Sequence, residues 1–402
     1  ENGSYSKMIK KRLVMASPYT KRLEASPIRT ILDRAAALRS EGRTVIPFSA
    51  GEPDFPTPST IKKATQKAIE DDFSQYTSNR GLPQLRELLA RKLKKEASVL
   101  YDPNTEILVT SSGAEALNNA ILTFVGPGDE VIIPTPAFVS YKNLVKFAGG
   151  EFIDVPLLPE DGFQLNAAKI EAAITGRTKM IIINNPNNPS GAVYTREALE
   201  QIADLAIQYD LLVLSDEMYS RLVYEDAQFV SMASLPGMKE RTITVSGFSK
   251  TYAMTGWRIG FIAADKALTD WLIKCHQYST TCSPTFIQKG IIDALDDPQT
   301  EREVQKMLDA FAVRRTTMIE RLQAIKQLKI ILPKGAFYIL VDVSGTGMDG
   351  MAFAMHLLEN YGVATVPAIG LGDSCKDYIR ISYAASDHDI AKGLTLISQC
   401  VE

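Results

Sequence analysis

Short apolar runs that alternate with helical patterns constrain the fold of this 402-residue chain more than any other feature. Residues 107–110 and 180–183, for example, have the length and composition of buried strands, and an amphipathic helical pattern follows each of them. The expected strands are 107–110, 130–134, 151–155, 180–183, 242–246 and 259–263, together with the run that ends at Asp216. Strands that alternate with helices predict an α/β fold, in which a mainly parallel mixed sheet is covered by helices on both faces.

The length of the chain predicts a large domain and a smaller companion, because a single hydrophobic core stops growing at ~250–300 residues. The elements expected near the C-terminus are a long helix at 296–325, strands at 330–332, 336–341 and 378–382, and a helix at 351–359. They predict a small α+β domain. We expect an N-terminal arm and part of that small domain at 1–58, a large domain at 59–299 and the C-terminal small domain at 300–402.

The N-terminal segment predicts an arm followed by a helix. That helix would bury one apolar face, formed by Ile28, Ile31, Leu32, Ala35 and Leu38. Residues 45–58 then predict a short strand that breaks into a loop, because three closely spaced prolines prevent regular strand pairing. Gly51 in this loop either lets a ligand approach the backbone closely or is an ordinary turn glycine.

Composition excludes several classes of protein. The chain is 45% hydrophobic and 23% charged, as in ordinary globular proteins, and a net charge of −3 leaves no basic face for nucleic acid. No apolar run approaches the ~20 residues that cross a bilayer, so we expect no membrane partner. Four cysteines without spaced histidines predict reduced thiols and no metal site. Since nothing resembles a signal peptide, we expect a cytoplasmic protein.

Lys250 is the first candidate for chemistry. It lies among small residues in the sequence V-S-G-F-S-K-T-Y-A-M-T-G-W-R, which ends at Arg258. Lysine is costly to bury unless its nitrogen is needed. A desolvated lysine beside another cation has the lowered pKa that Schiff-base chemistry requires. We therefore expect Lys250 to be a reactive amine beside a bound anion.

An anion site is expected where the strand at 107–110 turns into the following helix. The turn consists of small residues that lead to Gly113 and Ala114. The first amides of a helix have no partner within it, and the helix dipole is positive at that end. A phosphate would bind there, although such turns are common and this signal is weak by itself.

Further polar or aromatic side chains follow the other strands. Asp216 is either a ligand-binding acid or a helix cap, and Phe138 either stacks on a flat ligand or packs in the core. Asn188 and Tyr219 also follow strand ends. Because the carboxyl ends of parallel strands meet at one edge, we expect these residues to gather around Lys250. Tyr76, in a polar loop, is by itself more typical of a packing or surface residue.

Four motifs carry a resemblance to a known family. They are S-K-x(7)-R with G-W-R-I-G, N-P-N-N-P-S-G, S-D-E-M-Y and Y-I-R-I-S-Y-A, the last of which contains Arg380. From Ile28 to the C-terminus the chain resembles class I (fold-type I) aminotransferases that depend on pyridoxal 5′-phosphate (PLP), in the subgroup of bacterial aspartate, alanine and aromatic aminotransferases. The resemblance implies a ping-pong transfer of an α-amino group from an amino acid to a 2-oxo acid.

The resemblance also implies roles for residues at the cofactor. Lys250 would be the Schiff-base lysine and would move a proton between the substrate Cα and the cofactor. Asp216 would keep the pyridine nitrogen protonated, while Tyr219 and Asn188 would hydrogen-bond the phenolate oxygen O3′. Phe138 would stack on the ring.

Anion-binding roles are implied in the same way. Gly113, Ala114, Arg258 and a Tyr76 from the neighbouring subunit of a homodimer would hold the phosphate. Arg380 would bind the substrate α-carboxylate bidentately, assisted by Asn188 and the Gly51 loop. The Asn188–Pro189 peptide bond would be cis.

The chain departs from its relatives at two positions. Gly247 replaces a phosphate-binding serine of many relatives, and either Ser246 or Ser249 could compensate. Ala114 stands where some aspartate-specific relatives have a lysine, which weakens the case for a dedicated aspartate enzyme. The donor's side chain therefore stays open.

Alternative functions also stay open. A β-lyase would use the same lysine, because a fold does not decide a reaction. A cofactor-sensing regulator would need a DNA-binding module, for which we expect too few residues before Ile28. A degenerate, binding-only homologue is disfavoured because the lysine, the aspartate and both arginines are present.

Overall fold

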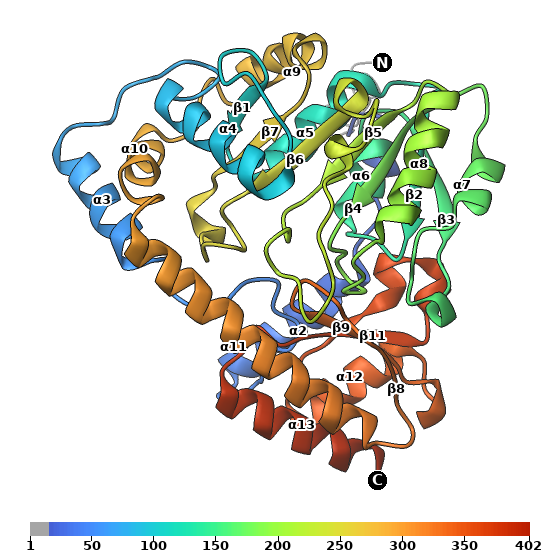
Figure 1. The fold of residues 1–402 in the computed structure, drawn as a ribbon. Helices are drawn as coiled ribbons and strands as arrows, with labels where there is room; N and C mark the ends of the chain where they lie inside the picture. Colours follow the sequence, from blue (N-terminus) through green and yellow to red (C-terminus); the bar gives the residue numbers. More distant parts are fainter. Residues whose placement is uncertain (1–15) are drawn as a thin grey trace, which may run out of the picture.

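The computed structural model describes residues 16–402 and contains two sheets, the larger of which has seven strands (Figure 1). The first part of the expected N-terminal arm lies outside the described residues. The strand order is β1-β7-β6-β5-β4-β2-β3, and β7 runs antiparallel to both neighbours while the other pairs are parallel. The strands are β1 (Ile107–Thr110), β2 (Glu130–Thr135), β3 (Glu151–Pro156), β4 (Thr178–Asn184), β5 (Leu212–Asp216), β6 (Thr242–Gly247) and β7 (Gly260–Ala263). The predicted mainly parallel mixed sheet is confirmed.

Helices cover both faces of this sheet. Successive strand side chains point to opposite faces, so Met180 and Ile182 of β4 join the core with α5, α6 and α9, whereas Ile181 and Ile183 join the core with α7 and α8. At the β1 edge, α4 and α10 complete a third core with α3. The helices are α3 (Ser59–Glu70), α4 (Pro83–Ala97), α5 (Gly113–Phe124), α6 (Ser140–Phe147), α7 (Ala167–Ala173), α8 (Arg196–Gln208), α9 (Lys266–Ser279) and α10 (Thr285–Ala294).

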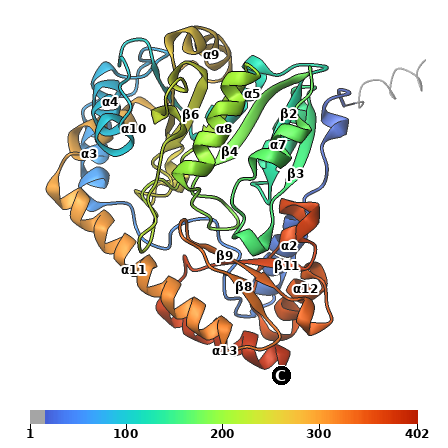
Figure 2. The ribbon, with the colours of Figure 1, turned by 45° about the vertical axis from the view of Figure 1, so that its right-hand side comes forward.

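A second, antiparallel sheet lies below the first in Figures 1 and 2, and the long helix α11 (Pro298–Gln323) runs from one to the other. Its strand order is β10-β11-β9-β8. Residues from α2 and from the C-terminal part of the chain share its core, because α12 packs against both α2 and α13. The elements are α2 (Pro27–Ser40), β8 (Lys329–Ile331), β9 (Tyr338–Asp342), α12 (Gly350–Tyr361), β10 (Val366–Pro367), β11 (Tyr378–Ser382) and α13 (Asp387–Val401).

Two expectations about the N-terminal segment are wrong. Leu32 is 44% exposed, because the buried stripe of α2 runs through Ile31, Ala35 and Leu38 and leaves Leu32 at its edge. The strand expected after residue 45 is reduced to one bridge between Ile46 and Val363, since Pro47 has no N–H with which to continue the pairing. Helices α6, α9, α10 and α13 and strand β10 were not predicted. The domain boundaries at 58/59 and 299/300 stay predictions.

Gly290 provides a test of the packing at the β1 edge. A Cβ on Gly290 of α10 would lie 2.0 Å from Thr65 Oγ1 and 2.8 Å from Thr65 Cα on α3, so the two helices would have to separate. We expect Gly290→Ala to lower the free energy of unfolding by about 1–3 kcal/mol, measured by chemical denaturation. Gly176→Ala is the control, because nothing lies within 4 Å of its added Cβ. Equal stability of the two variants would contradict this packing.

Candidate active site

A cavity of about 390 Å³ opens between the two sheets, a size typical of small-molecule sites. Its wall includes every site residue expected from the sequence except Tyr76: Gly51, Gly113, Ala114, Phe138, Asn188, Asp216, Tyr219, Lys250, Arg258 and Arg380. Tyr76 lies in the loop between α3 and α4 and is 85% exposed. The expected convergence therefore holds for the residues that follow the strands, and Tyr76 stands apart from the cavity of its own chain.

The carboxyl ends of adjacent parallel strands deliver the polar side chains. Asn184 ends β4 and pairs in register with Asp216, which ends β5. Asn184 Nδ2 donates to the Asp216 carbonyl at 3.0 Å, and Asn184 Oδ1 accepts the Asn188 amide at 2.7 Å. The Asn188–Pro189 bond is cis, as expected from the resemblance. These bonds place Asn188 against the cavity wall.

Asp216 is held by two donors. Tyr141 Oη donates to Oδ2 at 2.7 Å, and the Met218 amide donates to Oδ1 at 3.1 Å. Burial raises the pKa of Asp216, while both hydrogen bonds and the nearby Lys250 charge act in the opposite direction. Tyr141 was missed, because helix α6 was not recognised. Its spacing from Phe138, with which it makes an edge-to-face contact at 5.6 Å, was the available signal.

Lys250 points into the cavity, where its Nζ donates to the Gly51 carbonyl. The nitrogen also lies 5.9 Å from the ring centroids of Tyr219 and Phe337. The pKa of Lys250 is lowered to about 8, mainly by desolvation and also by the charges of Arg380 and Arg258, while Glu52 and Asp216 act in the opposite direction. The amine is therefore available in its neutral, nucleophilic form near physiological pH.

Arg380 reaches the cavity from β11 in the second sheet. Its guanidinium donates from Nη1 to Asn188 Oδ1 at 2.9 Å and from Nη2 to the Ser49 carbonyl at 3.3 Å, and it lies 4.3 Å from the centre of the Tyr338 ring. Its buried Nε has no hydrogen-bond partner among the described residues. A buried guanidinium held by neutral acceptors favours an anionic ligand.

The turn before α5 forms one end of the cavity. Ser112, the N-cap of α5, has a φ of 88°, and its hydroxyl accepts the Glu115 amide at 3.4 Å. Gly260 of β7 lies directly beneath, since a Cβ there would be 2.7 Å from the Gly113 nitrogen. Gly113 and Ala114, the first residues of α5, line the cavity, and Arg258, also left-handed at a φ of 55°, lines the same wall.

A side chain at Gly247 would be tightly confined. A Cβ at this position would lie 3.0 Å from the Gly260 Cα and 3.1 Å from the Ile259 carbonyl oxygen. Of the two serines that could replace the missing hydroxyl, Ser246 donates to the Glu217 carbonyl at 3.3 Å, whereas Ser249 lines the cavity. The geometry thus favours Ser249.

Tyr219 is buried beside the cavity and shares a hydrogen bond of 2.9 Å with the Tyr338 hydroxyl. Burial and this second hydroxyl raise the pKa of Tyr219 well above its ordinary value, so it is a neutral hydrogen-bond donor. Tyr338, on β9, was missed by the sequence reasoning. It lies on a strand of the second sheet, and no local motif indicated that it would face the first.

The structure also bears on metal binding and on membrane-spanning helices. Within residues 16–402, three potential metal-ligating side chains do not come together anywhere. The helices of the same part of the chain are all too short or too polar to cross a bilayer.

Fold and site together define a two-sheet α/β protein in which a buried lysine of lowered pKa shares one cavity with Arg258, Arg380 and the N-terminus of α5. The family model "Aminotransferase class I and II" matches residues 43–395, and the chain belongs to that family and is an aminotransferase. It is 43% identical to the aspartate aminotransferase of Pyrococcus abyssi, with 90% of this chain and 92% of that protein covered. Identity to aromatic-amino-acid aminotransferase 2 of Thermococcus litoralis is 40%, with 93% of each covered.

Solved structures agree with the fold. A single mutant of the Thermus thermophilus aspartate aminotransferase superposes with a TM-score of 0.91 at 37% identity, covering 96% of this chain and 99% of the other. The fold is therefore that of a fold-type I aminotransferase, as expected from the resemblance.

The lowered pKa of Lys250 predicts a pH-dependent reactivity. The protonated amine is unreactive, and it loses its proton as pH rises through about 8, well below the ~10.4 of an ordinary lysine. Modification of Lys250 by trinitrobenzenesulfonate, followed by peptide mass spectrometry, should reach half its maximal rate near pH 8. Arg380→Gln removes a cation that lowers this pKa and should shift the midpoint upward. A midpoint near 10 in the unsubstituted protein would contradict the proposed burial of the amine.

Proposed function

We propose that this aminotransferase binds PLP in the cavity and moves an α-amino group from an amino acid to a 2-oxo acid in two half-reactions. The observation that carries the proposal is that one cavity contains Lys250 with a pKa near 8, the buried Asp216, the α5 turn with Arg258, and Arg380. The class I and II family generally uses PLP. When bound, this group would supply an electron sink that stabilises negative charge at the substrate Cα.

The donor set fits such a group. A phosphate needs several N–H donors, which Gly113, Ala114 and Arg258 would provide, with the Ser249 hydroxyl beside them. Asp216 would bind the pyridine nitrogen, and the Tyr141 and Met218 donors keep the carboxylate fixed for that contact.

The remaining contacts would be made with the pyridine ring of PLP. Tyr219 and Asn188 would hydrogen-bond its phenolate oxygen, and Phe138 would cover one face. Tyr338 would hold the Tyr219 hydroxyl in place.

Lys250 would transfer protons in addition to binding PLP. Its neutral Nζ would accept the proton that leaves the substrate Cα and return it later in the reaction. Gly51 would orient the amine through its carbonyl group. Arg380 would hold the substrate α-carboxylate, which offers the charged acceptor that its Nε lacks in the protein alone.

The wall beside these groups favours an apolar or aromatic donor. Ile28, Leu32, Val139 and Leu371 line it, and its cations are the three already assigned. No further arginine or lysine of residues 16–402 lines the cavity to bind a second substrate carboxylate. Ala114 at the turn agrees with this, and the relatives include an enzyme named for aromatic amino acids.

A substrate panel tests the function and its rival. With 2-oxoglutarate as acceptor, phenylalanine and tyrosine should form glutamate with a higher kcat/KM than aspartate, because the wall is apolar. Lys250→Ala should lower turnover by at least about a thousandfold, since it removes the proton-transferring group. Lys63→Ala, at an exposed position on α3, is the matched control.

Three outcomes of this panel would contradict the proposal. Pyruvate and ammonia released without any 2-oxo acid would favour a β-lyase. Activity that survives Lys250→Ala would remove the assigned role of the lysine. Higher kcat/KM with aspartate would overturn the apolar-donor preference alone.

The exposed Tyr76 would belong to the cavity of a neighbouring subunit in a homodimer. Because Tyr76 is 85% exposed and does not line the cavity of its own chain, it would contribute to such a site only from another copy. We expect Tyr76→Ala to weaken PLP binding, and Lys250→Ala to be inactive. Subunits of the two variants should regain activity when mixed and exchanged, because a hybrid dimer contains one cavity with both residues intact. No recovery after verified subunit exchange would assign Tyr76 to its own subunit or to no site.

A further inference from the structure

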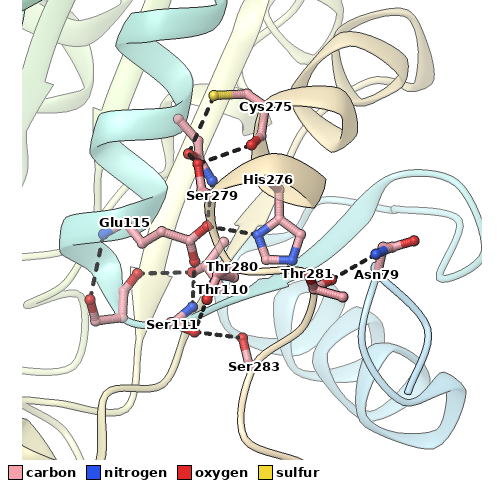
Figure 3. Close-up of polar contacts among 12 residues, drawn as sticks. Asn79, Thr110, Ser111, Glu115, Cys275, His276, Ser279, Thr280, Thr281 and Ser283 are labelled. Carbon is pink, nitrogen blue, oxygen red and sulfur yellow. Dashed lines mark hydrogen bonds and ion pairs between the residues drawn. The ribbon is translucent and has the colours of Figure 1, made fainter. Parts of the chain in front are cut away.

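A buried polar network lies directly behind the α5 turn, on the side away from the cavity. Figure 3 shows Glu115 of α5 pointing toward His276 of α9 and toward Ser111 of the turn. Glu115 Oε2 accepts the Ser111 amide at 2.5 Å, and Glu115 Oε1 contacts His276 Nδ1 at 2.7 Å. Neither Ser111 nor Glu115 lines the cavity, whereas Ser112 does. The network therefore touches the turn from behind.

His276 is fully buried, and its Nε2 has no hydrogen-bond partner among the described residues. A proton on Nε2 would be a buried donor without an acceptor, which is costly. The favoured form is therefore the neutral imidazole with its proton on Nδ1, from where it donates to Glu115.

Glu115 has a third donor, because Asn119 Nδ2 lies 2.6 Å from its Oε1. Asn119 is itself fully buried, and its Oδ1 accepts from Ser279 Oγ at 3.1 Å. Three donors from two helices and the turn thus fix one carboxylate. The Ser111 amide cannot move without disturbing all of them.

The same network reaches the loop that carries Tyr76. Ser111 Oγ lies 3.4 Å from Thr280 Oγ1, and Asn79 Nδ2 donates to the Thr281 carbonyl at 2.7 Å, as Figure 3 shows. Asn79 belongs to the Tyr76 loop between α3 and α4. The α5 turn, expected to hold the phosphate in this subunit's cavity, and the Tyr76 loop, expected to reach the phosphate of the neighbouring subunit, are therefore both anchored to the residues just after α9.

We propose that Glu115 and His276 are positioning residues for anion binding: they hold the Ser111 amide so that the turn from Ser112 to Ala114 keeps its amides directed at the cavity. The inference rests on the proposed function, since the bound anion would be the phosphate of PLP. Gly260 supports the turn from below, and the Glu115–His276 pair supports it from the α9 side. Neither positioning residue touches the ligand.

The test compares PLP with pyridoxal, which lacks only the phosphate. Binding of each to cofactor-depleted enzyme is measured by absorbance titration. His276→Leu removes the donor and keeps the carboxylate charge, so PLP affinity should fall about tenfold, as for the loss of a hydrogen bond to a charged group. Pyridoxal affinity should change by less than about twofold. His276→Asn places an amide N–H near the position of Nδ1. It should therefore retain the wild-type ratio of PLP affinity to pyridoxal affinity.

Two further variants keep the test decisive. Glu115→Ala should lower the ratio as well, and it supplies the result if His276→Leu does not fold. Thr269→Val is the matched control, because this buried α9 residue hydrogen-bonds the Thr105 carbonyl instead of the turn, and it should leave the ratio unchanged.

Several outcomes would overturn the inference. It fails if the folded His276→Leu or Glu115→Ala protein keeps the wild-type ratio, or loses affinity for both compounds equally. Tighter PLP binding by Glu115→Ala would also refute it, because the carboxylate would then act only as a repelling charge. If the wild-type enzyme does not bind PLP more tightly than pyridoxal, the proposed function itself is wrong, and the inference with it.

Discussion

Three cationic side chains share one cavity with a single buried carboxylate, and this excess of positive charge governs the site. Lys250 and Arg258 come from the connection between β6 and β7, Arg380 comes from β11, and Asp216 is the acid among residues 16–402 that lines the cavity with them. Burial and the two arginines explain why the pKa of the lysine falls to about 8. The same charges favour ligands that carry a phosphate and a carboxylate. The two arginines thus contribute both to the lowered pKa of the amine, together with its burial, and to the affinity for anions.

Each of the two sheets supplies part of this group of charged side chains. The larger sheet supplies the carboxylate at the end of β5, the lysine after the neighbouring β6, and the α5 turn after β1, which β7 separates from β6. The smaller sheet supplies Arg380 and Tyr338, and the hydrogen bond from Arg380 to Asn188 joins the sheets across the cavity. A shift of one sheet against the other would therefore change both the substrate contact and the pKa of Lys250.

Much of the local structure was predictable because it depends on short-range patterns in the sequence. The strands of the larger sheet end within a residue or two of their expected positions, and β11 matches its expected range. The convergence of Asp216, Asn188 and Lys250 followed from the parallel-sheet rule alone. Helix α9, in contrast, was missed, and with it the contact of His276 with Glu115, which lies 161 residues away along the chain.

The sequence by itself determined the class of fold, the residues at the strand ends and, through four motifs, the family, because periodicity and motif spacing are local properties. Only the tertiary structure decided the ionisation of Lys250, the donors to Asp216 and the support of the α5 turn. It also placed Ser249 in the cavity wall, while the Ser246 hydroxyl donates to the Glu217 carbonyl. Each of these depends on burial and on side chains brought together from distant segments, which no local pattern encodes.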